Sequence, residues 1–470
     1  MNSNKIKGLI ILGITAILLI VFTLYNQDAK RVNLDETKFT IYDSEENLMA
    51  EKENLHAPFS LAREIGFTQK IDKKIPVLEL NRTVTLEEAW LEGTGRLIFV
   101  YSIQLHETDN ENAVPELEIG EITYKNKDGE IFTVPIDEDN PGYFEMEENT
   151  VHNNKLYRMT MMYPHDLHRT INNEDMATFF EDIIEISLEE ISVTENEETA
   201  QIDDFAFSVN PRSRDDFFLS APVNEELNLG TNQKIGFDQL QIGLFMNRLI
   251  LTPDTSNQVS GFYLNTSLPD REIQYFEPVR YTKENEPFVS TSPFNKLPNE
   301  TEIKFRAIQY STEEKMEATI TKDQLTKLLD SEIDRVELAE KNGFVLFLEP
   351  PGNEGGDLKL SYEVPELISD WEYVIPLSVT TQRQLDEWLA HASSEEKRWI
   401  TRSESVFTAY TEEGTELGIG NLFRNSEHGF ALEFNPTDWL EEDVIQIHIA
   451  NLPLIEEINK ELVIEIPEYK

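Results

Sequence analysis

Apolar positions follow two different patterns along this chain of 470 residues. Residues 8–25 read GLIILGITAILLIVFTLY, an apolar run of 18 residues that contains no charge. From residue 76 onward, apolar and polar positions alternate in short segments, which is the pattern of half-buried strands. Residues 26–75 lie between them and carry charges of both signs, which predicts a stalk with a short helix around residues 47–65.

The apolar run predicts an N-terminal transmembrane helix, because a helix that crosses a bilayer needs roughly 17–25 apolar residues. A cleaved signal peptide would have a shorter apolar core followed by a small-x-small cleavage site. A lipoprotein signal would need a cysteine, and this chain has none. A buried core helix is the competing interpretation, but the polar flanks and the terminal position argue against it. We therefore expect an uncleaved membrane anchor at residues 8–25.

The charges on either side of the run predict the orientation of the anchor. Lys5 and Lys7 precede the run, and Lys30 and Arg31 follow it. With the α-amino group included, this count favours a cytoplasmic N-terminus by a small margin. We expect a single-pass cell-membrane protein in which residues 1–7 are cytoplasmic and the C-terminal ectodomain is extracytoplasmic.

The alternating segments predict strands and hairpins. Residues 97–103 (LIFVYSI) have the composition of a buried strand. Residues 119–124 and 131–136 predict a hairpin around an Asp128-Gly129 turn. The rest of the chain repeats such short apolar segments, so a mainly β fold is expected.

Helix signals are few and short. Thr321 and Gln324 have the spacing of a capping box, as do Ser393 and Glu396. Residues 382–392 carry apolar side chains at helical spacing. These segments predict small helical connectors between strands.

An internal repeat predicts the division into modules. Residues 182–191 align without gaps to residues 443–452, and residues 357–364 are a looser copy. Each copy precedes a second strand-like segment, which predicts recurring terminal hairpins. The expected domains are a β-sandwich at residues 76–211, a second at 226–380, and a β-rich third at 381–470 that is alternatively part of the second.

The segments Asp357-Leu-Lys-Leu and Trp371-Glu-Tyr-Val-Ile-Pro376 resemble the ectodomains of uncharacterised single-pass membrane proteins of Gram-positive bacteria. The resemblance covers residues 76–467 and implies two or three tandem immunoglobulin-like β-sandwich domains after the transmembrane helix. Many of these proteins also carry a cytoplasmic segment that resembles an anti-sigma factor. This chain has about seven residues there, which argues against a direct signalling role. The resemblance implies no catalytic residues.

Composition narrows the function classes. The formal net charge of −49 disfavours nucleic-acid binding, which needs a basic face, and also close contact with anionic lipids or wall polymers. Apolar residues make up 39% and aromatic residues 10% of the chain, enough for folded cores rather than disorder. The absence of cysteine is compatible with an exported protein that does not rely on disulfides.

The best metal candidate is the loop that begins at Asp137. Asp137, Asp139, Gly142 and Glu148 match positions 1, 3, 6 and 12 of an EF-hand calcium loop. Pro141 stands at position 5 and has no side-chain oxygen, and the flanking segments resemble strands rather than helices. The competing interpretation is a solvated acidic loop between two strands.

Other catalytic and metal-binding patterns are incomplete. His165 and His168 have the spacing of a zinc pair, but a zinc site needs a third ligand and no second cluster stands out. Ser394 and Lys397 form an S-x-x-K pattern without its companion motifs, and the capping box that begins at Ser393 explains the same residues. Carboxylate pairs cannot be selected among 89 acidic residues.

These observations lead to a non-enzymatic interpretation. We expect a membrane-anchored cell-surface interaction or sensing module that binds a protein or cell-wall partner, with no nucleic acid and no cofactor other than the candidate calcium ion. The alternative is an extracytoplasmic hydrolase of wall or glycan, whose catalytic residues the sequence does not identify.

Overall fold

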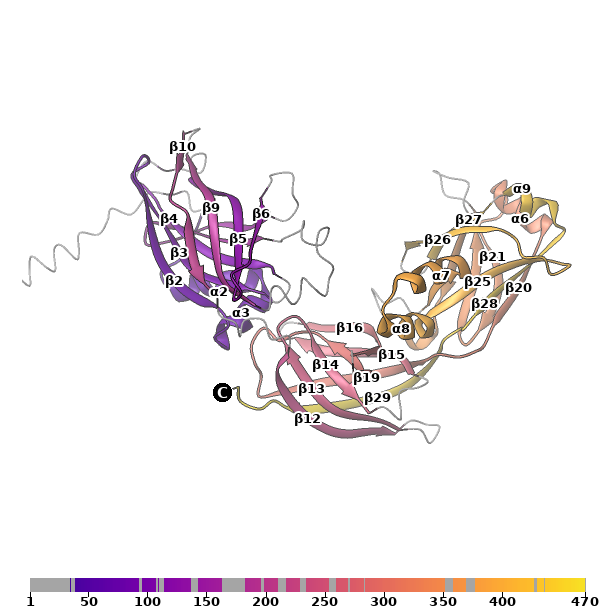
Figure 1. Ribbon diagram of the computed structural model, residues 1–470. Coiled ribbons are helices and arrows are strands. Elements are labelled where there is room, and N and C mark those ends of the chain that lie inside the picture. The colour runs from indigo at the N-terminus through magenta and orange to yellow at the C-terminus, as the bar shows by residue number, and fades with distance from the viewer. Residues whose placement is uncertain are drawn as a thin grey trace, which may run out of the picture. The chain divides into compact units, whose positions relative to one another are not determined.

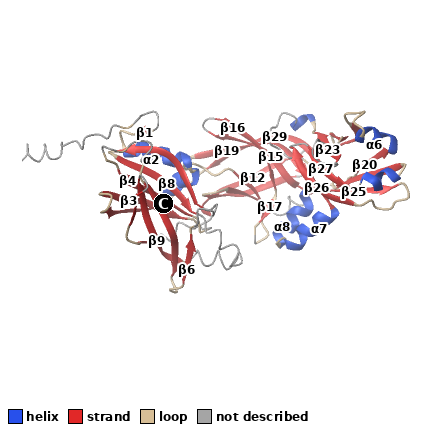
Figure 2. Ribbon diagram, turned by 90° about the horizontal axis from the view of Figure 1, so that it is seen from above, coloured by secondary structure: helices blue, strands red, loops and turns tan. Residues whose placement is uncertain are grey.

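The computed structural model is mainly β and divides into two compact units (Figures 1 and 2). The first unit comprises Met1–Asp216 with Phe294–Lys296, and the second comprises Phe217–Pro293 with Leu297–Lys470. The structure describes residue 34 and residues 39–469 except 93–94, 107–108, 110–113, 137–142, 163–181, 196–197, 210–216, 229–233, 253–258, 269–270, 283, 351–357, 369–376, 427–428 and 435. The predicted membrane anchor at residues 8–25 therefore lies outside the described residues.

Within the described residues, the first unit contains two sheets and two helices. One sheet has the order β1 (Thr40–Ile41), β7 (Tyr143–His152), β8 (Lys155–Met162), β4 (Leu97–Gln104), β3 (Arg82–Leu91), β2 (Gln69–Val77). The other has the order β10 (Glu198–Gln201), β9 (Ile183–Glu195), β5 (Glu116–Asn126), β6 (Ile131–Pro135), and β11 (Phe205–Ser208) also pairs with β9. The helices are α2 (Glu45–Leu55) and α3 (Ala57–Glu64).

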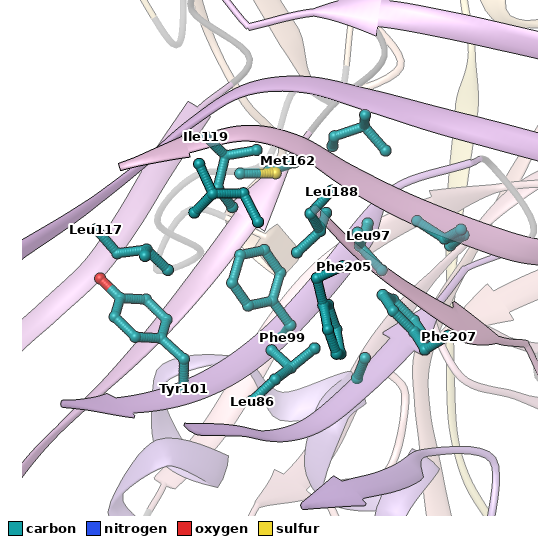
Figure 3. Close-up of a cluster of buried hydrophobic side chains, with 14 of the residues drawn as sticks. Leu86, Leu97, Phe99, Tyr101, Leu117, Ile119, Met162, Leu188, Phe205 and Phe207 are labelled. Carbon is teal, nitrogen blue, oxygen red and sulfur yellow. The ribbon is translucent and has the colours of Figure 1, made fainter. Parts of the chain in front are cut away.

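The two sheets of the first unit enclose one hydrophobic core, as in a β-sandwich. Alternate residues of β4, among them Phe99 and Tyr101, point toward the second sheet (Figure 3). Leu188 of β9 and Phe205 of β11 meet them from the opposite side, and all four are almost completely buried. Because side chains alternate along a strand, the other residues of β4 face the helices.

Residues 45–64 belong to this unit rather than to a free stalk, which corrects the expectation for that part of residues 26–75. The side chains of Leu48, Phe59 and Leu61 are completely buried. The ring of Phe59 lies 6.4 Å from that of Trp90 on β3. The high charge of the segment indicated a stalk, but its few apolar residues are grouped on helix faces that pack against the first sheet.

The second unit begins with another pair of sheets. Their strand orders are β12 (Phe217–Asn228), β13 (Lys234–Gly243), β14 (Asn247–Leu251), β18 (Pro287–Thr291), β17 (Arg280–Tyr281) and β16 (Arg271–Pro278), β15 (Val259–Leu268), β19 (Glu300–Tyr310), β29 (Leu454–Glu465). Three aromatic rings join the sheets: Phe305 lies 5.1 Å from Phe237 and 5.4 Å from Phe262. These contacts form the centre of a second sandwich-like core.

Two further sheets form a third core in the same unit. Their orders are β20 (Met316–Thr321), β28 (Val444–Ala450), β25 (Glu404–Thr411), β24 (Ser378–Thr381) and β21 (Val336–Lys341), β22 (Phe344–Glu349), β23 (Leu358–Glu363), β27 (Gly429–Phe434), β26 (Ile419–Ser426). The helical segments are α6 (Lys322–Leu329), η3 (Glu366–Ile368), α7 (Gln382–His391), α8 (Ser394–Ser403) and α9 (Pro436–Glu441). Trp439 of α9 is completely buried in this core.

This third pair of sheets is inserted into the second pair. β19 and β29 pair directly, with Ile303 opposite Leu462, although all strands from β20 to β28 lie between them in the chain. Consequently β28 pairs with β20 and β25 but not with β29, so the hairpin expected from the repeat at residues 443–452 does not form. The expected boundary near residue 380 falls at β24, within the inserted sheets.

Local predictions are confirmed more often than long-range ones. β5 and β6 form the predicted hairpin, and Gly129 in its turn has a φ of +82°, which glycine adopts without strain. Thr321 and Ser393 cap α6 and α8 with the predicted capping boxes. Among the helices of the described residues, none has both the length and the apolar character needed to cross a membrane.

Candidate functional site

The residues singled out for metal binding lie mostly beyond the described part of the chain. Asp137 and Asp139 are outside it, as are His165 and His168. Glu148 lies in β7, where only the backbone is described. Within the described ranges, no group of three or more His, Cys, Asp or Glu side chains is arranged to hold a metal ion.

Two buried carboxylates of the first unit lie between α2–α3 and the first sheet. Glu88 and Glu92 are on the face of this sheet that packs against the helices, and they are 4% and 1% exposed. Arg63 of α3 approaches Glu88, with 3.0 Å between Nε and Oε2. Arg96 contacts Glu92, with 3.3 Å between Nε and Oε2, and the Nε2 of His56 lies 3.4 Å from the Oε1 of the same carboxylate.

These contacts hold the helices to the sheet rather than exposing an acid for catalysis. Each carboxylate has an arginine partner, Arg63 for Glu88 and Arg96 for Glu92. Both residues are almost completely buried, so neither carboxyl is open to a substrate. Glu88 and Glu92 therefore lack the accessible pair of carboxyls that a glycoside hydrolase needs.

The second unit has a polar hollow at the sheet β16-β15-β19-β29. Its volume is about 290 Å³. Asn265, Lys304 and Glu461 lie directly opposite one another on three adjacent strands, β15, β19 and β29. The remaining lining residues are Phe305, Arg306, Asn459 and Lys460.

Irregular strand pairing at Arg306 shapes this polar hollow. Tyr263 and Leu264 are consecutive in β15, but their partners on β19 are two positions apart. Arg306 is the β19 residue between these two partners. On the β29 side, both Ile458 and Asn459 stand opposite Arg306. Bulges of this kind bend a strand and redirect side chains, and they are frequent beside functional sites.

Asn459 provides the backbone conformation that the bulge on β29 requires. Its φ is +44°, in the left-handed region that asparagine tolerates better than most residues. Its side-chain amide donates a hydrogen bond to the carboxylate of Glu457. The sequence Asn459-Lys460-Glu461 thus combines a bulge residue with two charged residues at the edge of the hollow.

Asn265 is the most buried polar residue of the polar hollow. It is 6% exposed, and its Oδ1 has no hydrogen-bond partner among the described residues. Sequence reasoning missed this site, because its residues come from three strands that are distant in the chain. The available signal was a pair of cationic residues, Lys304 and Arg306, within one strand of a very acidic chain.

Comparisons with known proteins give little support for any assignment. No protein-family model matches the chain, and no curated protein matches it. The crystal structure of the conserved domain protein from Bacillus anthracis is similar over 55% of this chain and 82% of that chain, at 9% sequence identity and a TM-score of 0.20. A TM-score this low carries no argument about fold or function, so the function rests on the chain's own residues.

Proposed function

We propose that this chain is a membrane-anchored extracytoplasmic protein whose β-sandwich units, of the immunoglobulin-like kind, bind a protein or cell-wall component without catalysis. Residues 8–25 are the anchor and residues 1–7 the cytoplasmic tail. The observation that carries the proposal is the order of the chain, in which an uncharged apolar run of 18 residues precedes folded β units with their own cores.

The composition and the sheets support this interpretation. Sandwich-like units position loops and sheet edges for recognition, and binding residues concentrate on such exposed segments. The buried carboxylates of Glu88 and Glu92 are engaged with Arg63, Arg96 and His56. Their role is structural, so they lend no support to a wall or glycan hydrolase.

In-cell crosslinking followed by affinity purification tests the proposal. The full chain is compared with a truncation after residue 38, which keeps the apolar run and lacks both units. We expect a protein or wall fragment that is recovered with the full chain alone. Equal recovery from both chains would contradict a binding role for the β units. Release of soluble sugar from purified walls by the full chain would instead favour the hydrolase.

A further inference from the structure

The polar hollow of the second unit has a charge opposite to that of the whole chain. Lys304, Arg306 and Lys460 line it together with one acidic residue, Glu461, whereas the chain carries a net charge of −49. Lys304 also approaches Glu302, with 3.3 Å between Nζ and Oε2, and both side chains are about one-third exposed. Three cations around one cavity favour a carboxylate or phosphate, which accepts charge-assisted hydrogen bonds from Arg and Lys.

Asn265 adds a second requirement to the ligand. The buried Oδ1 of Asn265 lacks a partner within the described structure, and an acceptor buried without a hydrogen bond is destabilising. A ligand hydroxyl that donates to this oxygen would recover that free energy. Chloride and sulfate have no such hydroxyl, whereas a sugar or polyol has several.

We propose that the polar hollow binds an anionic ligand that also carries hydroxyl groups, the chemistry shared by acidic sugars and polyol phosphates. The cations bind the anionic group, and the Oδ1 of Asn265 accepts a hydrogen bond from a hydroxyl. The volume of about 290 Å³ is at the lower end of ligand pockets, which suits one sugar or polyol unit of a longer chain.

The acidic charge of the whole chain does not prevent this binding. At physiological ionic strength the Debye length is about 8 Å, so distant carboxylates are largely screened. Lys304, Arg306 and Lys460 line the cavity itself, so they act on a bound anion at shorter range than those carboxylates do. The overall charge therefore slows the approach of an anionic polymer, while the local cations determine binding at contact.

This inference deepens the proposed function and rests on it for the origin of the ligand, an anionic wall component. Binding by the purified full chain does not depend on where the chain resides. A failure of the polar hollow to bind would thus be distinguished from a failure of the crosslinking experiment. The two experiments report separately on ligand class and on partner.

Calorimetric titration of the purified full chain tests the inference with two matched pairs of probes. D-glucuronate is compared with D-glucose, and glycerol 3-phosphate with glycerol. We expect saturable binding of one anionic probe in the millimolar range, at least about tenfold tighter than its neutral counterpart. The tighter of the two anions identifies the source as an acidic sugar or a polyol phosphate.

Variants assign the binding to named residues. The double variant Arg306→Gln and Lys460→Gln is expected to weaken binding by about tenfold or more, because two charged contacts are lost. The matched control, Lys315→Gln with Lys322→Gln, removes the same charge from exposed positions outside the polar hollow and should bind as the parent does.

Asn265→Leu separates the role of the hydroxyl from that of the charge. Acetate, an anion without a hydroxyl group, is titrated as an additional probe. This variant should weaken binding of the favoured probe by about tenfold and leave the affinity for acetate unchanged. It should also raise the Tm, because the variant no longer buries an acceptor without a partner. The inference is overturned if neither anion binds, if the neutral probes bind equally, or if the variants bind as the parent does.

Discussion

Arg82 and Asp109 form two parallel hydrogen bonds inside the first unit. Nη1 of Arg82 donates to Oδ2 at 2.7 Å, and Nη2 donates to Oδ1 at 2.6 Å. The Nε of Arg82 also donates to Glu195 at 2.7 Å. Because Arg82 begins β3 and Glu195 ends β9, this guanidinium joins the two sheets. Burial alone would lower the pKa of Arg82, but the bonds to Asp109 and Glu195 outweigh it, and the pKa is raised.

Asp109→Ala should strongly destabilise the first unit. The side chain of Arg82 is completely buried, so the substitution leaves a buried cation with only part of its compensation. Loss of one partner of a buried ion pair costs about 3–5 kcal/mol. Urea denaturation measures this cost.

A control for Asp109→Ala is Lys125→Ala, which breaks an exposed pair with Glu185 whose side chains are 42% and 43% exposed. Such pairs contribute about 0–1 kcal/mol. Equal losses in the two variants would contradict the structural role assigned to Asp109.

Gly261→Ala should destabilise the second unit. A Cβ at this position would collide with the ring of Phe276 and lie 2.9 Å from the backbone oxygen of Glu277. Overpacking of this kind typically costs about 1–3 kcal/mol. Gly418→Ala is the matched control, because nothing lies within 4 Å of the added methyl group and φ is not positive there. Thermal denaturation of both variants measures the effect, and we expect a lower Tm for Gly261→Ala alone. An unchanged Tm in Gly261→Ala would contradict the prediction and show that Phe276 moves aside without loss of stability.

Glu404→Gln should raise the stability of the second unit at neutral pH. Burial raises the pKa of Glu404, and the hydrogen bond donated by Ser378, 2.8 Å from Oε2, opposes this only in part. A carboxyl whose pKa is higher in the folded state destabilises the fold when it is ionised. This cost is relieved as the pH falls through the raised pKa toward the unfolded value.

The pH dependence of the Tm tests this prediction. Glutamine keeps an acceptor for Ser378 but carries no charge, so Glu404→Gln should raise the Tm at pH 7 by roughly 2 °C. The difference from the parent should shrink as the pH approaches 4. A variant with a lower Tm than the parent at pH 7 would contradict the assignment of a destabilising charge to Glu404.

Sequence patterns predict the parts of this fold that short-range interactions determine. The hairpin around Gly129 depends on a turn and two adjacent strands, and the capping boxes at Thr321 and Ser393 depend on residues three apart. Both kinds of feature can be recognised within about ten residues of sequence. They were predicted correctly for that reason.

Long-range pairing escapes the same reasoning. Nothing near Leu462 indicates that it pairs with Ile303 across an inserted pair of sheets. Likewise, the helices that contain Leu48 and Phe59 have few apolar residues, and their burial depends on the sheet that covers them. The polar hollow also could not be predicted in this way, because the surroundings of Arg306 are formed by the strands on both sides of β19.

The central claim, a cytoplasmic tail followed by a span and an extracytoplasmic ectodomain, is tested most directly by cysteine labelling in intact cells. The chain has no cysteine, so single substitutions report without background. Leu78→Cys introduces a thiol at a position 80% exposed in the first unit, and Ser3→Cys introduces one before the span.

A membrane-impermeant maleimide is predicted to label Leu78→Cys in intact cells and to label Ser3→Cys after lysis alone. The cysteine-free parent serves as the control for non-specific labelling. Protection of Leu78→Cys until lysis, or labelling of Ser3→Cys in intact cells, would contradict the predicted topology.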